Sequence, residues 1–171
     1  EFSLAVLGPR GDIVPGLFLH SSATAMPLQL TLKSNSTLPI EVEGVLPERC
    51  AGLPLAEVER LPIFHGREKL PLAEFFEVAG TTDDLELVFR GDGRGVHFIG
   101  AGMTKGRIQV EGNAGRHLGA QIRDGVIVVQ GNCSDWAGAE MRGGRIEIRG
   151  NCGHQPGAAY RGSPRGMRGG E

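Results

Sequence analysis

Histidine and cysteine are the residues of this chain with the most versatile chemistry, because they bind metals and act as bases or nucleophiles. A zinc site needs several such side chains to converge on one point. The histidines do not share one common spacing in the sequence; they are His20, His65, His97, His117 and His154. Neither an acid–base pair nor a nucleophile with a neighbouring base stands out. We therefore predict no metal site, no catalytic residue and no cofactor-binding residue on this chain.

The three cysteines, Cys50, Cys133 and Cys152, indicate a reducing compartment, because an odd, small number is unlike a disulfide framework. Cys133 and Cys152 have a spacing that recurs throughout the C-terminal half of the chain, as described below. If they occupy neighbouring strands, a disulfide is geometrically conceivable. Buried thiols packed on each other are the preferred interpretation. We expect a cytoplasmic protein.

Two glycine-rich stretches, GDGRG (91–95) and GNAGRHLG (112–119), resemble phosphate-binding loops. They lack the Lys-Ser/Thr pair of a nucleotide-binding loop, and no helical pattern follows them. A repeat explains their glycines better. Successive copies of the same residue type are 19 positions apart. These columns are Gly112, Gly131 and Gly150; Gly100, Gly119, Gly138 and Gly157; and Asn113, Asn132 and Asn151.

Apolar residues keep the same period, as in Ile108, Ile127 and Ile146. A unit this short cannot bury its own apolar side chains, but stacked copies can, because each strand then pairs with its counterpart one coil away. We predict a mainly β fold, a single-stranded parallel β-helix with coils of about 19 residues. Each coil should hold two short strands and two tight corners, with glycine and asparagine at the corners.

The period slips after Gly157. If Met167 is the counterpart of Met141, the step between them exceeds the period by seven residues, so seven residues are inserted. The stretch AYRGSPR (159–165) is the expected site of this insertion, which should loop out on one face.

The sequence before the repeats has a different character. Residues 27–33 and 39–46 alternate in strand fashion, 54–61 has helical spacing before Pro62, and 84–92 resembles a strand. Residues 63–80 predict a short strand at 63–65, a turn at Gly66, a helical turn at 71–76 and a strand at 76–78. We therefore expect a small α+β module over 26–83 and repeats over 84–171 that are C-terminally truncated. Residues 1–25 are interpreted as a non-native or disordered extension.

Charge gives one hint about partners. Residues 1–90 hold 7 Lys+Arg and 13 Asp+Glu, whereas residues 91–171 hold 11 and 7. This bias is too weak to predict nucleic-acid binding, and no apolar run is long enough to span a membrane. Arginine and tryptophan are enriched at protein interfaces. We therefore predict that Trp136, Arg161 and Arg165 contact a partner.

The repeats, with their Gly-Asn corners, resemble the C-terminal β-helical domain of glutamate synthase and its relatives. The more specific stretches are LAEVERLPIFHGREKLPLAEFFEVAG (55–80) and LELVFRGDGRGVHFIGAGMTKGRIQVEGNAGRHLGAQIRDG (85–125). They resemble the C subunit of formylmethanofuran dehydrogenase, especially its version in the bacterial formyltransferase/hydrolase complex. The resemblance covers residues 26–171, with no counterpart for 1–25, and it implies that the β-helix is right-handed.

The resemblance implies a scaffold subunit without an active site of its own, in a complex that handles formyl groups on methanofuran. The expected partners are the other three kinds of subunit in such a complex: an amidohydrolase-like protein (A), a second protein (B) and a formyltransferase (D). Any cofactor, a molybdenum or tungsten pterin or zinc, would sit on those partners. Whether the complex is a dehydrogenase or a hydrolase stays open.

Two alternatives remain from the sequence. A glutamate-synthase-like β-helical domain of an amidotransferase would have a long barrel domain upstream, where this chain has a short module. A left-handed hexapeptide acyltransferase would repeat in sixes, with eighteen residues per coil, and would need a catalytic histidine in the stack.

Overall fold

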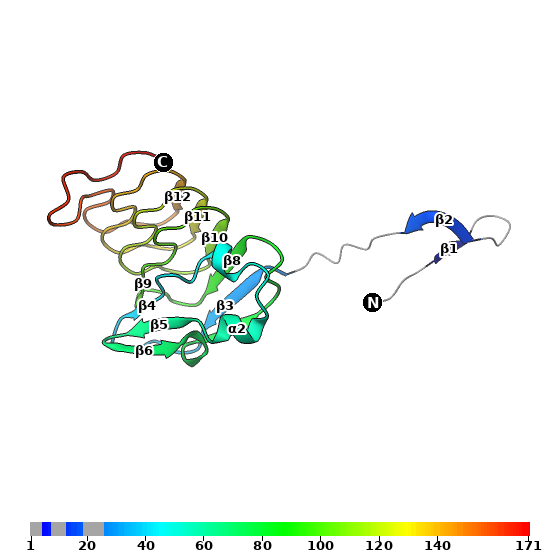
Figure 1. The fold of residues 1–171 in the computed structure, drawn as a ribbon. Coiled ribbons are helices and arrows are strands. Elements are labelled where there is room, and N and C mark those ends of the chain that lie inside the picture. Colours follow the sequence, from blue (N-terminus) through cyan, green and yellow to red (C-terminus); the bar gives the residue numbers. More distant parts are fainter. Residues whose placement is uncertain (1–4, 8–12, 19–25) are drawn as a thin grey trace.

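A computed structural model describes the backbone of residues 5–7, 13–18 and 26–171, and the side chains from residue 26 onward (Figure 1). This part of the chain is mainly β with few helices, which confirms the predicted class. The helices are α1 (Pro47–Cys50), α2 (Leu55–Glu59) and the 3-10 helix η1 (Leu72–Glu74). Among the described residues, no helix is long and apolar enough to cross a membrane.

Near the N-terminus, β1 (Ala5–Leu7) and β2 (Ile13–Phe18) pair with each other in antiparallel fashion. The predicted extension over 1–25 also includes residues 1–4, 8–12 and 19–25, which lie outside the described residues. The interpretation of this segment therefore stays a prediction.

The first large sheet joins the module to the repeats. Strand β3 (Leu28–Leu32) lies between β7 (Phe76–Ala79), to which it is antiparallel, and β8 (Glu86–Arg90), to which it is parallel. Leu28 and Leu30 are buried on the inner face, as the alternating pattern predicts. From β8 the sheet continues through β10 (Arg107–Val110), β11 (Val126–Val129) and β12 (Arg145–Ile148).

The second sheet covers another side of the module. Its order is β6 (Glu68–Pro71), β5 (Pro62–His65), β4 (Ile40–Glu41) and β9 (Val96–His97), and β9 pairs in parallel with β4. Thus the module and the repeats share both sheets.

The short elements of the module follow local sequence signals. Helix α2 lies inside the predicted 54–61, and it begins after Pro54 with Val58 buried. The predicted helical turn at 71–76 is η1, and the predicted strand at 39–46 is only two residues long because Gly44 takes φ +88°. Helix α1, with Pro47 at its first turn, and strand β6 were missed.

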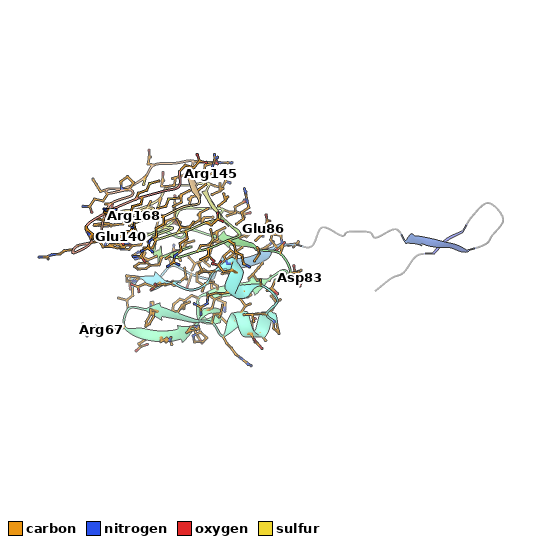
Figure 2. All side chains as sticks on the ribbon, turned by 45° about the horizontal axis from the view of Figure 1, so that its top comes forward. Arg67, Asp83, Glu86, Glu140, Arg145 and Arg168 are labelled. Atoms are coloured by element: carbon orange, nitrogen blue, oxygen red, sulfur yellow. The ribbon has the colours of Figure 1, made fainter. Side chains whose placement is uncertain are left out.

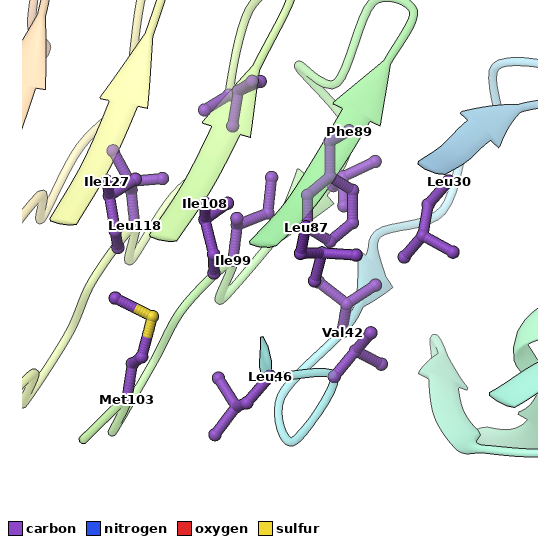
Figure 3. Close-up of a cluster of buried hydrophobic side chains, with 14 of the residues drawn as sticks. Leu30, Val42, Leu46, Leu87, Phe89, Ile99, Met103, Ile108, Leu118 and Ile127 are labelled. Atoms are coloured by element: carbon purple, nitrogen blue, oxygen red, sulfur yellow. The ribbon is translucent and has the colours of Figure 1, made fainter. Parts of the chain in front are cut away.

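The repeats stack by parallel strand pairing. Ile127 of β11 faces Ile108 of β10 and Ile146 of β12, each one period away in the sequence. The step from β8 to β10 is longer than the period by two residues, since Leu87 faces Ile108. The inward columns at these positions form one continuous apolar core that reaches back to the module (Figure 3). Burying an isoleucine such as Ile127 contributes roughly 1.5–3 kcal/mol.

The second strand expected in each coil is reduced to a single bridge. Ala114 bridges Gly93 on one side and Cys133 on the other, and Cys133 bridges Cys152. The extended run is short because His117 and its counterparts take a left-handed backbone conformation a few residues later.

The last coil contains the predicted insertion. Arg142 bridges Gly169, and the backbone N–H of Arg168 donates to Met141 O at 2.8 Å. Both pairings exceed the period by about the length of the predicted insertion, so this register agrees with seven additional residues in the coil. The segment 159–165 therefore leaves the stack and returns to it, near the C-terminal end in Figure 1.

Candidate functional site

One corner of the repeats carries a column of aromatic rings, which we call the aromatic corner: Phe98, His117, Trp136 and Tyr160. The first three are spaced by one period and have φ of 61°, 61° and 67°. Such left-handed backbone is uncommon for residues other than glycine. The rings of Phe98 and His117 stack with centroids 4.5 Å apart, and those of His117 and Trp136 lie 6.1 Å apart.

Tyr160 comes from the insertion and completes the aromatic corner. Its ring lies 5.5 Å from Trp136 and 5.6 Å from His117. Its hydroxyl is hydrogen-bonded to His117 Nδ1 at 2.9 Å. Burial, followed by the nearby His97 and Arg116, lowers the pKa of His117, and burial raises the pKa of Tyr160. Both shifts favour the neutral forms of the two groups.

Glu140 fixes the same insertion from a second point. Its buried carboxylate accepts a hydrogen bond from Gln121 Nε2 at 2.9 Å and another from the Tyr160 backbone N–H at 3.1 Å. Hydrogen bonding, first from the Ser163 hydroxyl and then from Gln121, lowers the pKa of Glu140. The insertion is thus held by a ring stack on one side and by an ionised carboxylate on the other.

The three residues predicted to contact a partner lie around this insertion. Trp136 is half-buried under Tyr160, whereas Arg161 and Arg165 are exposed. Among the described residues, neither arginine forms a salt bridge. The anchored insertion therefore presents two free guanidinium groups next to an aromatic corner.

A polar column runs beside the aromatic corner. Arg116, Asp135 and His154 occupy equivalent positions, as the period predicts. Asp135 Oδ1 accepts a hydrogen bond from the His154 backbone N–H at 2.8 Å, and Arg116 Nε lies 3.7 Å from its other oxygen. The His154 N–H is the main cause that lowers the pKa of Asp135. Within the described residues, no group of three His, Cys, Asp or Glu side chains is placed to hold a metal ion.

The asparagines form a column at another corner, which we call the asparagine corner: Asn113, Asn132 and Asn151. Asn113 Oδ1 accepts from the Asn132 backbone N–H, and Asn132 Oδ1 accepts from the Asn151 backbone N–H, each at 2.8 Å. Each of these two side chains therefore accepts a hydrogen bond from the backbone of the next coil. Asn113 Nδ2 also donates to Asp92 Oδ1 at 3.0 Å, which ties this column to the first coil.

The glycine columns occupy positions where a side chain would not fit. A Cβ on Gly131 would lie 2.7 Å from Gly112 O, and the same conflict recurs at Gly112 and Gly150. The other column has left-handed φ angles, here 59° at Gly119. This column contains Gly100, Gly119, Gly138 and Gly157.

All three cysteines are free thiols. Burial raises the pKa of Cys133 to about 12 and that of Cys50 to about 11. Since the thiolate is the reactive form, Cys50 and Cys133 have a packing role. Cys152 is exposed, so the prediction of two buried thiols packed on each other is wrong for this residue.

Four residues of this site were not found from the sequence: Phe98, Gln121, Glu140 and Tyr160. Phe98 lies one period before His117, and Gln121 lies one period before Glu140. The period could therefore have indicated both the ring column and the pairing of Gln121 with the Glu140 carboxylate. Tyr160 belongs to the insertion, where the period no longer applies.

Comparisons with known proteins place this geometry in context. No protein-family model matches the chain. The chain is 43% identical over 87 residues to the C subunit of the molybdenum-containing formylmethanofuran dehydrogenase 1 of Methanothermobacter marburgensis, a match covering 50% of this chain and 22% of that relative. It is 36% identical over 110 residues to the corresponding protein of Methanosarcina barkeri, covering 61% and 36%. The matched region thus spans only about a fifth to a third of these relatives.

Among solved structures, the chain resembles one from the formyltransferase/hydrolase complex of Methylorubrum extorquens, determined in complex with methylofuran. The TM-score is 0.78 at 29% identity, and the match covers 83% of this chain and 53% of the other. The resemblance to the C subunit of formylmethanofuran dehydrogenase is therefore confirmed by the sequence matches, and the fold resembles that of a chain from the formyltransferase/hydrolase complex. It favours this interpretation over the glutamate synthase alternative.

Proposed function

We propose that this chain is a non-catalytic scaffold, the C subunit, of a formylmethanofuran dehydrogenase-type complex of the bacterial formyltransferase/hydrolase kind. The observation that carries the proposal is the structural likeness to the Methylorubrum extorquens complex, which extends over 83% of this chain. That match includes more than the repeats, which are predicted to begin at residue 84.

We propose further that the repeats form a single-stranded right-handed parallel β-helix and that 26–83 is a module at its start. The in-register parallel pairing of β8, β10, β11 and β12 supports this proposal. So does the column of asparagine side chains, because they bond from one coil to the next. A stack of this kind is stiff, and rigidity is what a scaffold contributes to an assembly.

The proposed partner contact is Trp136 together with Arg161 and Arg165. The insertion that carries the arginines is already fixed by Tyr160 and Glu140. Binding therefore orders fewer side chains than a free loop would, and this lowers the entropic cost of association. The proposed partners are the amidohydrolase-like A, the B and the formyltransferase D proteins of such a complex, which carry the chemistry and any cofactor.

The test is affinity purification of the full-length, tagged gene product from its native host at moderate salt, with the recovered proteins identified by mass spectrometry. The proposal predicts that an amidohydrolase-like protein and a formyltransferase are recovered in fixed proportion to the tagged chain. The double variant Arg161→Gln/Arg165→Gln should reduce this recovery. Its matched control is Arg149→Gln, which should not, because Arg149 follows β12 and is paired with Glu147.

Recovery of a molybdenum or tungsten protein with iron–sulfur proteins would instead assign the chain to a dehydrogenase. Recovery of the tagged chain alone would contradict the scaffold role. Release of formate from a formyl donor by the purified chain alone would contradict its non-catalytic character.

A further inference from the structure

A second column of charged side chains lies along another edge of the coils. We call it the arginine column: Arg123, Arg142 and Arg168. Their backbone N–H groups donate to the preceding coil in the same way, to Met103, Ile122 and Met141 respectively, at 2.8–2.9 Å. The insertion of seven residues between the second and third arginine therefore leaves the column in register.

The arginine column differs from most other arginines of the stacked coils, which have acidic partners. These pairs are Arg90 with Glu111, Arg94 with Asp92, Arg116 with Asp135, Arg145 with Glu171, and Arg149 with Glu147. The three members of the column are exposed, and none has a salt bridge within the described part of the chain. Figure 2 shows Arg168 on a different edge of the repeats from Arg145.

The carboxylates near the column each accept a hydrogen bond from a group other than these arginines. Asp124 Oδ1 accepts from the Gly125 backbone N–H at 2.7 Å, and Glu140 accepts from Gln121 and Tyr160. At the foot of the column, Glu48 Oε1 accepts from the Thr104 backbone N–H at 2.7 Å. Glu140 contributes some attraction to Arg142, but its oxygens are occupied by other donors. Within the described residues, none of the three guanidinium groups donates a hydrogen bond to another side chain or to the backbone.

Neighbouring coils are ~4.8 Å apart, and like charges at equivalent positions of successive coils repel one another. A bound row of carboxylates would turn this repulsion into attraction. Arginine is suited to this because its planar group binds a carboxylate through two parallel hydrogen bonds.

We propose that the arginine column is a docking site for an acidic α-helix of a partner protein. Carboxylates three and four residues apart on one helix face are ~5–6 Å from one another, which matches the spacing of the coils. Nucleic acid is a poorer fit, because the net charge of the chain is −2 and nucleic-acid-binding domains are strongly basic. The inference is independent of the aromatic corner and of the identity of the assembly.

The experiment uses the full-length chain and two synthetic helical peptides of identical composition. One peptide has its glutamates aligned on a single face, and its isomer has them spread around the helix. Binding is measured by fluorescence anisotropy at low ionic strength, where exposed charges are least screened. We expect the aligned peptide to bind at least ~10-fold more tightly than its isomer, and this preference to vanish as salt is raised.

Variants then locate the site. We expect Arg123→Gln/Arg142→Gln/Arg168→Gln to lose the preference for the aligned peptide, and Arg142→Gln alone to weaken it. The matched control, Arg94→Gln/Arg145→Gln/Arg149→Gln, removes three charges from arginines that have acidic partners and should keep the preference. Circular dichroism checks that every variant is folded. Equal binding of the two peptides, or equal loss in the column and control variants, would overturn the proposal while leaving the proposed assembly untouched.

Discussion

The asparagine corner and the aromatic corner belong to the same coils, yet the first repeats one residue type and the second varies it. The asparagine corner has the same residue in each of three coils and the same 2.8 Å hydrogen bond between them. The aromatic corner has Phe98, His117 and Trp136 at equivalent positions, followed by Gln155. Thus the repeated residue holds neighbouring coils together, whereas the varied residue occupies a position where the stack does not require one residue type.

Both corners depend on the same buried core, because the stacked coils hold each corner in place. Replacing Ile127 by Ala removes a fully buried side chain at the centre of an inward column. We expect this change to lower the free energy of unfolding by about 2–5 kcal/mol, measured by urea denaturation.

Gln109→Ala on the outer face of β10 is the control for this core substitution. Its effect should stay within ~0.5 kcal/mol. If the two variants lost similar stability, the repeats would not share the continuous core described above.

The aromatic corner should matter more for assembly than for folding. We expect Trp136→Ala to weaken association with the partner proteins by about 30-fold, which corresponds to ~2 kcal/mol. Trp136→Phe keeps a ring against Tyr160 and should recover most of the affinity. Surface plasmon resonance with the purified partners measures both. Unchanged affinity in the alanine variant would remove this corner from the interface.

The asparagine corner should show the reverse behaviour. Asn132→Ala removes the acceptor for the Asn151 backbone N–H, and we expect a loss of about 1 kcal/mol in stability. Its affinity for the partner proteins should stay that of the wild type. Ser134→Ala, in the same coil, is the control. An effect of Asn132→Ala on assembly without one on stability would reverse the roles assigned to the two corners.

The smallest expected effect concerns pH. The pKa of Glu140 in the folded chain is below its ordinary value of 4.5, because hydrogen bonds from Ser163, Gln121 and the Tyr160 N–H favour the ionised form. Its stabilising contribution is therefore complete above pH ~4.5 and is lost as the pH falls through the lower folded value. Glu140→Gln should show a shallower loss of stability on acidification than the wild type.

The comparison for this pH effect is Glu68→Gln, on the exposed strand β6. Denaturation curves at several pH values between ~3 and ~6 measure the slope. An identical slope in Glu140→Gln and the wild type would mean that this carboxylate does not hold the insertion.

The same contrast explains what the sequence could and could not predict. The inward isoleucines, the asparagine column and the extra length of the last coil follow from one period, because stacking forces equivalent residues into register. The period does not predict the longer step between β8 and β10 or the helix α1, because no earlier copy of the repeat exists to compare them with. The position of Tyr160 depends on a contact with His117 across 43 residues, which no local pattern encodes.

The most direct test of the scaffold role is electron cryomicroscopy of the assembly purified from the native host through the tagged full-length chain. The account predicts the chain as an ordered stack of coils, with a partner protein packed against Trp136 and the insertion at 159–165. An assembly in which that corner and insertion face solvent would contradict the account. So would a purified chain that has no partner at all.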